Sequence, residues 1–518
     1  MRFGVRFWAI AAVICAFASG SQAVPAKTNP FSGKKLIEYG WDVPSTRFVR
    51  EHVREMEKVP FDGVVIKVLP KPDSSEGTES LGWKAWSKTR LTPEQYEHAI
   101  ADLKVTKFTR FTDNFIQLIS APGDVDWFDK DWDSIAYNAA CLARVAKLGG
   151  CKGIMLDPED YGNCLWGYAN ISAKLKDGRT FDEYAAKIRQ RGAEFMRAIN
   201  KEYHDVTILS LVGPALSCLH KDIKEDRYGL LYAFFEGMCE VATPGTTIID
   251  GFEQSYGYRD LKDFRYGRLI MRDYAKILFA TKNRGEFTEH MRAGFGIWAD
   301  YGIAGWHTDC FAMNYFTPDG LRESLSNALR ASDEYVWVYS EKMKWWNFNV
   351  PVEYREALAL AKTGPGPGDP RRPKIVRLPV ADWRFSVDEK VVGERQGWCG
   401  SDFDDSSWQT VRIDTPWLHQ IDMDYRGAAW YRRKFTAPKV ADGQTVYLVI
   451  GAADQVGWVW LNGRGMGGHY FGEGSSNISF VVDVTEYLKS GSENVLAIRV
   501  FSPGDNGGIW QPIQLMIR

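Results

Sequence analysis

The 518-residue sequence carries almost no net charge, few histidines and no paired cysteine motif. Its 64 basic and 66 acidic residues give a formal net charge of −2, and no block of Lys or Arg occurs, so nucleic acid is not expected as a partner. The eight histidines show no paired spacing for zinc, and the Asx and Gly spacing of a calcium loop is missing. These absences predict neither a metal site nor a cofactor.

Several catalytic and membrane signatures are missing as well. No GxSxG nucleophile elbow and no Gly-rich dinucleotide fingerprint occurs. Beyond the amino terminus, no apolar window approaches the length of a transmembrane helix. Once residues 1–23 are removed the cysteines form an odd, scattered set, which predicts no disulfide framework, although one disulfide is compatible with it. Any chemistry must therefore come from other side chains.

The first 23 residues have the pattern of a secretory signal peptide. Arg2 and Arg6 form a positive start, residues 7–18 a short apolar stretch, and residues 21–23 a small-residue cleavage site. The apolar stretch is too short to span a bilayer, so cleavage is expected rather than anchoring. We therefore predict a secreted or periplasmic protein with no membrane attachment after cleavage.

What the sequence has in excess is aromatic side chains: 20 Trp, 23 Tyr and 28 Phe, or 14% of all residues. Carbohydrate-active proteins often have this composition, because the C–H face of a sugar stacks on an aromatic ring whose edge can still hydrogen-bond. Packing in hydrophobic cores is the alternative explanation, and for any single Trp it is the stronger one. The chain length predicts two or three domains, since one compact core does not extend over 518 residues.

Residues 33–362 alternate short apolar runs with amphipathic helical segments, which is the pattern of repeated βα units. Eight strands are expected, at residues 35–42, 63–69, 115–120, 153–157, 207–213, 247–253, 293–299 and 335–341. Eight strands alternating with helices predict a (β/α)8 barrel of the TIM type, which would be the catalytic domain. A doubly wound open sheet is the alternative, but no Gly-rich phosphate loop follows any of these strands.

The pattern changes after residue 362. Residues 363–375 are rich in Pro and Gly and predict a linker, and residues 376–518 show short alternating strands separated by Gly, Asp and Asn, as in an all-β sandwich. Five segments follow one another there: DFDDSSWQTVRIDTPW, GAAWYRRKFTAP, VGWVWLNGRGMGGH, VVDVTEYLKSGSENVLAIRV and GGIWQPIQL. This region resembles the sugar-binding jelly roll, a galactose-binding-like domain, at the amino end of family 2 glycoside hydrolases such as β-galactosidases. The resemblance implies a jelly-roll domain that supports the barrel or binds sugar.

Acidic residues cluster where the barrel strands are expected to end. Four strands finish on acids, which are Asp42, the pair Asp157 and Glu159 in the segment GIMLDPEDYG, Glu253, and Glu341. The active site of a (β/α)8 barrel forms at the carboxyl ends of its strands, so acids at this rim are candidates for catalysis. We expect these side chains to be unburied, because the strands have reached the mouth of the barrel.

Paired carboxylates at such a rim are suited to the cleavage of glycosidic bonds. One carboxylic acid protonates the departing oxygen while a carboxylate attacks the sugar or activates water. We predict Glu159 as general acid/base and Glu253 as nucleophile or base, with the division of roles between the two left open. Asp157 shares a strand face with Glu159 and would keep it protonated by like-charge repulsion, and Glu341 is the alternative to Glu253.

Residues near the same strand ends are candidates for substrate binding. Trp345, close to Glu341, would form a stacking wall, and His307 would contact substrate hydroxyls. The full predicted set is Trp41, Asp42, Tyr161, Tyr256, Trp298, His307 and Trp345. Structural roles are the alternative for each, since acids at strand ends also cap helices, Asp42 before Pro44 also fits a turn, and a loop histidine is also found simply solvated.

The segments DPEDYG and DGFEQSYGY resemble barrels of uncharacterised secreted glycosidase-like proteins, which implies glycosidase activity. The Asn-Glu-Pro triplet of the largest retaining clan is absent, which puts that clan's catalytic pairing in doubt. We therefore predict a secreted glycoside hydrolase acting on a poly- or oligosaccharide. The alternatives are a non-catalytic carbohydrate-binding protein and a polysaccharide lyase that would use Tyr161 or Tyr256 with Arg259. The sugar, the linkage and the oligomeric state are left open.

Overall fold

The structure is a computed structural model that describes residues 31–517. Within this range it leaves out residues 122–124, 162–164, 176, 220–221, 303–305, 309–310, 312–313, 364–373, 420–424, 455, 471–479 and 504–506. The predicted signal peptide and most of the predicted linker therefore lie outside the described residues. Among the helices that are described, none combines the length and the apolar character that crossing a membrane requires.

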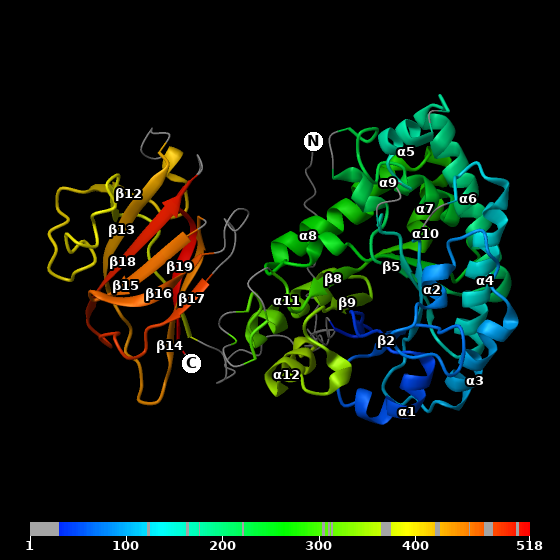
Figure 1. Ribbon diagram of the computed structural model, residues 1–518, viewed down its shortest axis with the longest axis horizontal. Coiled ribbons are helices and arrows are strands. Elements are labelled where there is room, and N and C mark those ends of the chain that lie inside the picture. The colour runs from blue at the N-terminus through cyan, green and yellow to red at the C-terminus, as the bar shows by residue number, and fades with distance from the viewer. Residues whose placement is uncertain are drawn as a thin grey trace, which may run out of the picture.

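Nine parallel strands form one sheet in the first part of the chain (Figure 1). They are β1 (Lys35–Glu38), β2 (Gly63–Ile66), β3 (Phe115–Ile119), β4 (Gly153–Asp157), β5 (Thr207–Ser210), β6 (Thr247–Asp250), β7 (Met291–Ala293), β8 (Phe295–Trp298) and β9 (Tyr335–Tyr339). The order across the sheet is β7-β6-β5-β4-β3-β2-β1-β9-β8. Strand β7 pairs with β6, and β8 pairs with β9. The consecutive strands β7 and β8 therefore take the place of one barrel strand, here called the seventh stave, and together close the sheet. The predicted (β/α)8 barrel is confirmed.

Gly294 interrupts this seventh stave between its two halves. A Cβ at this position would lie 2.6 Å from Cγ2 of Ile249 in β6, which is too close for any side chain. The stave also begins at Met291, two residues before the predicted start. Glycine therefore allows the chain to change partners here, in the way that glycines mark breaks in other strands.

Helices surround the sheet and complete the connections between its strands (Figure 1). The longer helices are α1 (Thr46–Met56), α3 (Glu97–Val105), α4 (Asp133–Leu148), α6 (Phe181–Glu202), α7 (Leu231–Val241), α8 (Leu261–Leu269), α11 (Pro318–Ala331) and α12 (Val352–Ala361). The shorter helices are α2 (Leu81–Lys84), α5 (Tyr168–Leu175), α9 (Ala275–Leu278) and α10 (Arg284–His290). The longest, α6, begins with a capping box between Thr180 and Glu183, which satisfies two of its free backbone N–H groups.

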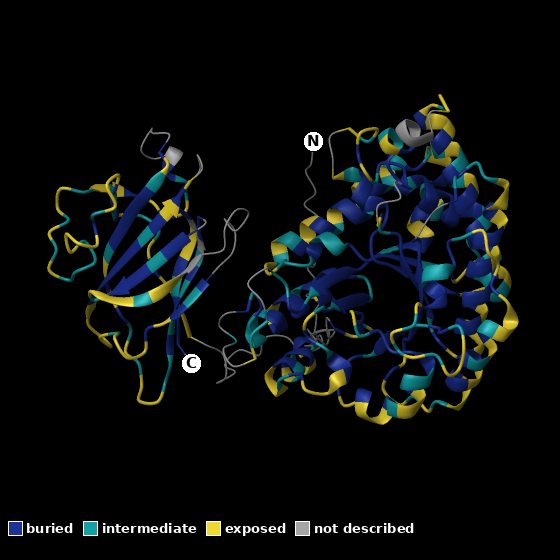
Figure 2. Cartoon of the chain, in the orientation of Figure 1, coloured by how far each residue is buried: buried dark blue, intermediate teal, exposed yellow. Residues whose placement is uncertain are grey.

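Two groups of apolar side chains stabilise the barrel. One fills the layer between the strands and the helices. The other fills the barrel interior and includes Ile37, Val65, Phe115, Met155 and Trp337, all of them buried. The strands are therefore buried on both faces (Figure 2), as expected for a parallel sheet covered by helices.

Much of the aromatic content goes into hydrophobic cores. Among the tryptophans whose burial the structure describes, nine are fully buried, namely Trp86, Trp127, Trp132, Trp166, Trp337, Trp345, Trp383, Trp417 and Trp430. Four of them, Trp86, Trp127, Trp132 and Trp166, pack around Phe234 of α7. For these residues core packing, the alternative explanation of the aromatic content, is correct.

Residues 374–517 form two antiparallel sheets with a common hydrophobic core. Their strands are β10 (Lys374–Arg377), β11 (Trp383–Val387), β12 (Gln409–Val411), β13 (Gly427–Thr436), β14 (Val446–Ala453), β15 (Val456–Leu461), β16 (Arg464–Tyr470), β17 (Phe480–Asp483), β18 (Glu493–Ser502) and β19 (Ile509–Ile517). The sheet orders are β10-β19-β14-β17 and β12-β11-β13-β18-β15-β16, which confirms the predicted all-β sandwich. Asn462 and Gly463, with φ of 52° and 82°, form the tight turn between β15 and β16.

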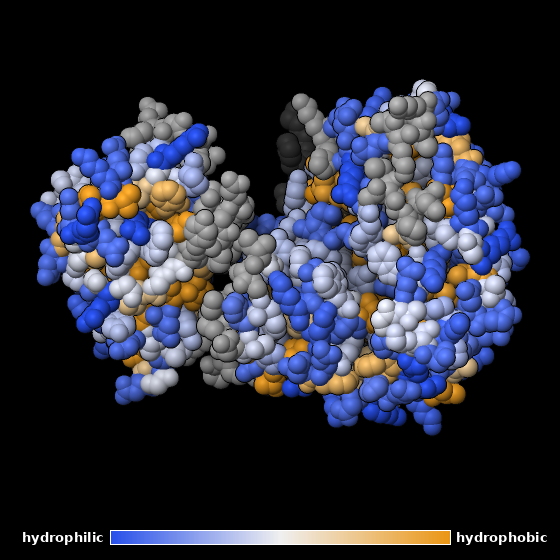
Figure 3. All heavy atoms as spheres, in the orientation of Figure 1, coloured by the Kyte–Doolittle hydropathy of each residue, from blue (hydrophilic) through white to orange (hydrophobic). Residues whose placement is uncertain are grey.

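The surface in view is largely hydrophilic, with scattered apolar side chains (Figure 3). Single exposed hydrophobic residues are normal on a protein surface. Among the large hydrophobic side chains that the structure describes, Trp41 is the most exposed, at 68%. This residue follows β1 at the carboxyl end of the barrel, where a cleft opens.

Candidate active site

A cleft of about 810 Å³ lies at the carboxyl ends of the barrel strands. Its size is within the usual range for ligand sites. Its walls come from the ends of strands β1, β2, β3, β4, β5, β6, β8 and β9 and from the loops that follow them. The lining residues are Tyr39, Gly40, Trp41, Val43, Lys67, Glu76, Gly77, Thr78, Glu79, Ser80, Trp83, Gln117, Glu159, Tyr161, Leu211, Glu253, Tyr256, Trp298, Tyr339 and Glu341. The structure thus brings Glu159, Glu253 and Glu341 into one cavity, as the sequence predicted from their strand ends.

Asp157, Glu159 and Tyr161 form a hydrogen-bonded group at the end of β4. The hydroxyl of Tyr161 lies 2.8 Å from Oδ2 of Asp157 and 2.7 Å from Oε2 of Glu159. A hydroxyl has one hydrogen to donate, so both contacts are hydrogen bonds only when one of the carboxyls is protonated. Burial, reinforced by the negative charge of Glu159, raises the pKa of Asp157 to about 7. The two carboxyls and the tyrosine hydroxyl therefore share an extra proton near neutral pH.

Glu253 meets Glu159 from the loop after β6. Its carboxyl lies close enough to Glu159, Asp157 and Tyr256 for their electrostatic effects to be felt, and Glu159 and Glu253 line the same cleft. Burial raises the pKa of Glu253 to about 9, with the charges of Glu159 and Asp157 adding to the effect. Glu253 is consequently protonated at neutral pH.

A strained backbone presents Glu253 to the cleft. Strand β6 ends at Asp250, and Phe252 adopts the left-handed conformation, with φ of 40°, immediately before a short 3₁₀ helix starts at Glu253. Non-glycine residues rarely adopt this conformation, and such strain concentrates at functional sites. The buried carboxylate of Asp250 accepts hydrogen bonds from the backbone nitrogens of Ala215 at 3.1 Å and Phe252 at 3.2 Å. Asp250 therefore holds the loops after β5 and β6 together.

Aromatic rings form the wall of the cleft next to the acids. Tyr256 and Tyr339 are stacked with ring centroids 5.3 Å apart, and Trp298 packs edge-on against both. The indole nitrogen of Trp41 donates to the hydroxyl of Tyr339 at 2.6 Å, and that hydroxyl donates to Glu341 at 3.2 Å. Trp41 and Glu341 are thus linked through one tyrosine, and the amine of Lys344 lies over the indole ring, 5.4 Å from its centroid.

The loop after β2 supplies the part of the cleft that the sequence analysis missed. Residues 67–84 contribute Lys67, Glu76, Glu79 and Trp83 to the lining. The ring centroids of Trp83 and Tyr161 are 5.4 Å apart. The available signal was the position of this acidic segment after a predicted strand, at the same rim as the other acids.

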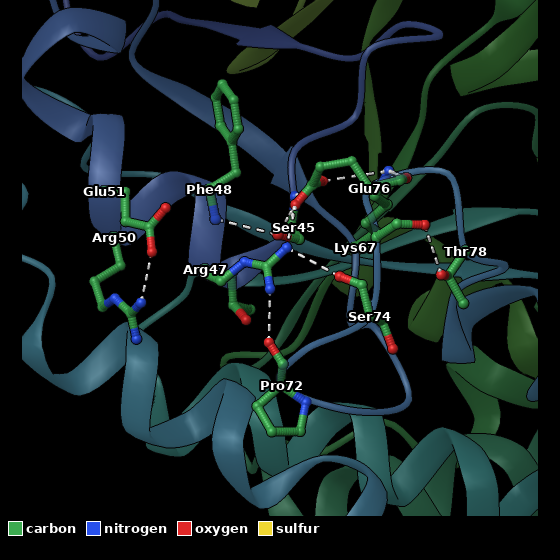
Figure 4. Close-up of polar contacts among 12 residues, drawn as sticks. Ser45, Arg47, Phe48, Arg50, Glu51, Lys67, Pro72, Ser74, Glu76 and Thr78 are labelled. Carbon is green, nitrogen blue, oxygen red and sulfur yellow. Dashed lines mark hydrogen bonds and ion pairs between the residues drawn. The ribbon is translucent and has the colours of Figure 1, made fainter.

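Polar contacts fix this loop to the start of α1 (Figure 4). The carboxylate of Glu76 accepts hydrogen bonds from the backbone nitrogen and hydroxyl of Ser45, the residue that caps α1. Arg47 donates to the carbonyl oxygens of Pro72 and Ser74. Because the loop is held on both sides of its tip, the cleft wall is preformed.

Asp300 holds the loop after β9 in a comparable way. Its buried carboxylate accepts hydrogen bonds from the indole nitrogen of Trp298 at 2.7 Å and from the backbone nitrogens of Glu341 at 3.1 Å and Met343 at 2.6 Å. It positions two lining residues without lining the cleft itself.

The structure corrects four expectations about this rim. Asp157 is completely buried, so the acids at the strand ends are not all exposed. Trp345 is also fully buried and packs edge-on against Phe61, which prevents the stacking role predicted for it. Asp42 turns away from the cleft and accepts a hydrogen bond from the backbone of Trp346 at 3.0 Å. His307 does not line the cleft either.

The remaining predicted residues fall into two groups, those that line the cleft and those that lie outside it. Trp41, Tyr161, Tyr256 and Trp298 line the cleft, as expected. Arg259, the charge that a lyase would need, donates to the carbonyl oxygen of Tyr315 and lies over its ring, outside the lining. In the described part of the chain one group has the spacing of metal ligands, Glu286, Glu289 and His290 around α10, and it lies outside the lining too.

Comparison with known proteins finds similarity in the carboxy-terminal region. The family described as Beta-galactosidase second all-beta domain matches residues 393–506. A Beta-glucuronidase of Formosa agariphila is 27% identical over 132 residues, and Beta-galactosidase BoGH2A of Bacteroides ovatus is 27% identical over 142 residues. A Beta-galactosidase of Thermoanaerobacter pseudethanolicus is 33% identical over 107 residues. The resemblance of this domain to β-galactosidase-type proteins is confirmed.

The similarity is confined to a part of each protein. The matches cover 20–25% of this chain and 13–16% of those relatives. Among solved structures, Beta-glucuronidase from Ruminococcus gnavus aligns with 15% identity and a TM-score of 0.26, covering 29% of this chain and 30% of that chain. Beta-glucuronidase from Lactobacillus rhamnosus aligns with 20% identity and a TM-score of 0.26, covering 30% of each chain.

Proposed function

We propose that the protein is a glycoside hydrolase whose catalytic pair is Glu159 and Glu253. The observation that carries this proposal is the placement of both side chains in one aromatic-walled cleft at the carboxyl end of the barrel, where burial and the charge of Glu159 raise the pKa of Glu253. With its pKa raised to about 9, Glu253 holds a proton at neutral pH beside Glu159. A protonated acid beside a carboxylate is what glycosidic cleavage requires.

In this proposal Glu253 is the general acid. Its proton passes to the glycosidic oxygen as the bond from that oxygen to the anomeric carbon breaks. Glu159 then attacks the anomeric carbon or takes a proton from the water that does so, while Tyr161 orients its carboxylate.

The charge of the cleft supports an uncharged sugar as substrate. The described lining contains five glutamates and one cation, Lys67. The amine of Lys67 donates to the carbonyl oxygen of Glu76 at 2.6 Å and lies 3.6 Å from its carboxylate. A uronic acid would bring a further negative charge next to the glutamates, and the one cation of the described lining is already paired with Glu76.

Secretion is part of the same proposal. Residues 1–23 have the signal-peptide pattern, and polysaccharides are substrates that an enzyme meets outside the cytoplasm. Amino-terminal sequencing of the protein recovered from the medium or periplasm of an expressing bacterium should give residue 24 as its first residue. Recovery of the full-length chain in the cytoplasm would contradict secretion.

The direct test compares the wild type with Glu159→Gln and Glu253→Gln. The substrates are a polysaccharide panel and the 4-nitrophenyl β-glucoside, β-galactoside and β-glucuronide. Each variant should lose about 10²- to 10⁴-fold in kcat/KM, the usual contribution of a general acid or base. Glu55→Gln is the control, because Glu55 is exposed on α1, away from the cleft. Full activity in both variants would refute the assignment of the pair.

A further inference from the structure

Three side chains that can ligate a metal ion converge on one face of α10, away from the cleft. Glu286, Glu289 and His290 each offer one ligand atom, and these atoms lie within 4.8 Å of one another. Residues three and four positions apart share a face of a helix, which explains why they meet. None of the three lines the cleft, so this group is separate from the proposed catalytic residues.

His290 is held in the way that metal-binding histidines usually are. Its side chain is 2% exposed, and its Nδ1 lies 2.9 Å from the backbone carbonyl oxygen of Thr246. A carbonyl oxygen can only accept a hydrogen bond, so Nδ1 carries the hydrogen and Nε2 of the neutral ring presents a lone pair. Such a bond at the other ring nitrogen fixes the tautomer and the orientation of a histidine ligand.

The Nε2 atom of His290 faces Glu286 without a hydrogen bond. It lies 3.8 Å from Oε2 of Glu286, which is too long for one. Among the described residues, Nε2 is not one of the enclosed side-chain atoms that lack a partner, so solvent reaches this edge of the ring. Ligand atoms around a tetrahedral zinc ion lie roughly 3.3–3.5 Å apart. Small rotations of the half-buried Glu286 and the exposed Glu289 therefore suffice to close the site.

The two glutamates lack a compensating basic side chain. The last turn of a helix carries a partial negative charge, so acids there are unfavourable unless a cation offsets them. Arg284, which starts α10, and Arg292, which follows it, both donate to backbone carbonyl oxygens. In the described part of the chain, Glu286 forms an ion pair with His290 alone and Glu289 forms none. A bound cation would supply the missing positive charge.

We propose that Glu286, Glu289 and His290 bind a zinc ion, with water completing its coordination. Zinc accepts imidazole nitrogen together with carboxylate oxygen, whereas calcium and magnesium prefer oxygen ligands alone. Through His290 and its bond to Thr246, the ion joins the end of α10 to the residue before β6. This position is on the amino-terminal face of the barrel, opposite to the cleft, where residues serve stability instead of catalysis.

Isothermal titration with zinc chloride tests the site, using the purified protein after dialysis against EDTA. The wild type should bind zinc, and Glu286→Gln and Glu289→Gln should each weaken binding by at least about tenfold, because a neutral amide replaces a charged ligand. Glu97→Gln on α3 is the control, since it also removes an exposed glutamate. It should stay within about twofold of the wild type, because distant surface charges are screened.

Thermal unfolding gives a second readout of the same site. Zinc should raise the melting temperature of the wild type and of Glu97→Gln, because an ion that binds the folded state alone stabilises it. The rise should vanish in Glu289→Gln, and a rise that persists there would overturn the inference.

Two further results would also overturn it. The first is no zinc binding by the wild type, which would leave the contact between Glu286 and His290 as an ion pair of a protonated imidazole. The second is zinc binding that Glu159→Gln weakens and Glu289→Gln does not, which would place the ion among the glutamates of the cleft.

Discussion

The backbone nitrogen of Glu159 donates a hydrogen bond of 3.0 Å to Oδ1 of Asp157, the last residue of β4. This contact turns the chain at the strand end and directs the side chain of Glu159 into the cleft. The second oxygen of Asp157 faces the hydroxyl of Tyr161. Asp157 is therefore placed to act through its neighbours, as a positioning residue.

Asp157→Asn tests this role. The amide oxygen still accepts from the Glu159 nitrogen, but the negative charge that helps to raise the pKa of Glu253 is lost. We expect kcat/KM to fall about tenfold or more and its alkaline limb, set by Glu253 near pH 9 in the wild type, to move to lower pH. The measurement is the pH profile of kcat/KM on a glycosyl fluoride. A lower rate with an unmoved alkaline limb would mean that Asp157 serves the fold alone.

Glu253→Gln should stabilise the protein while removing activity. The pKa of Glu253 is about 9 in the folded protein against an ordinary value of 4.5, so the unfolded chain ionises first as the pH rises. The folded state is thus progressively disfavoured between these two values, and the glutamine variant escapes this cost. We expect its advantage in thermal stability to be small at pH 5 and to grow up to pH 9, by on the order of a few kcal/mol. A constant difference across this range would show that Glu253 is not held protonated.

The barrel and the position of its acids were predictable from the sequence for a simple physical reason. Parallel strands covered by helices are buried on both faces, so GIMLD and TIID stand out as apolar runs, and the residues after them reach the carboxyl rim. Glu159 and Glu253 followed from that rule. The spacing of the runs did not show that Gly294 divides the seventh stave, because the two halves differ only in the strand each pairs with, β6 or β9.

Side-chain directions beyond the strand ends were less predictable. Trp345 follows Glu341 by four residues, yet a 3₁₀ turn from Trp345 to Asn347 directs its ring into the core against Phe61. The wall formed by Glu76 and Trp83 was missed because the polar loop after β2 has no periodicity to read. In both cases tertiary contacts decide the position, and no local pattern encodes them.

Gly213→Ala tests whether the contact between the loops after β5 and β6 supports the site. A Cβ at Gly213 would lie 2.4 Å from Cγ of Asp250, which also holds the backbone of Phe252 before Glu253. We expect a loss of about 1–3 kcal/mol in the free energy of unfolding, measured by denaturant titration, together with lower kcat. Gly285→Ala in α10 is the matched control, because nothing lies within 4 Å of its added Cβ and alanine favours the helix. Equal effects of the two substitutions would remove the support for this contact.

Trp41→Ala tests the aromatic wall apart from the chemistry. The indole lines the cleft, is 68% exposed and makes one hydrogen bond, to the hydroxyl of Tyr339, so its loss should leave the melting temperature nearly unchanged. Sugar stacking on an aromatic ring contributes about 1 kcal/mol, which predicts a rise of about fivefold in KM for lactose or cellobiose with little change in kcat. Tyr266→Ala on α8 removes an aromatic ring that is 57% exposed and outside the cleft, and it should change neither quantity. A loss of kcat in Trp41→Ala with KM unchanged would place the indole's effect on the acids, through Tyr339 and Glu341, instead of on the sugar.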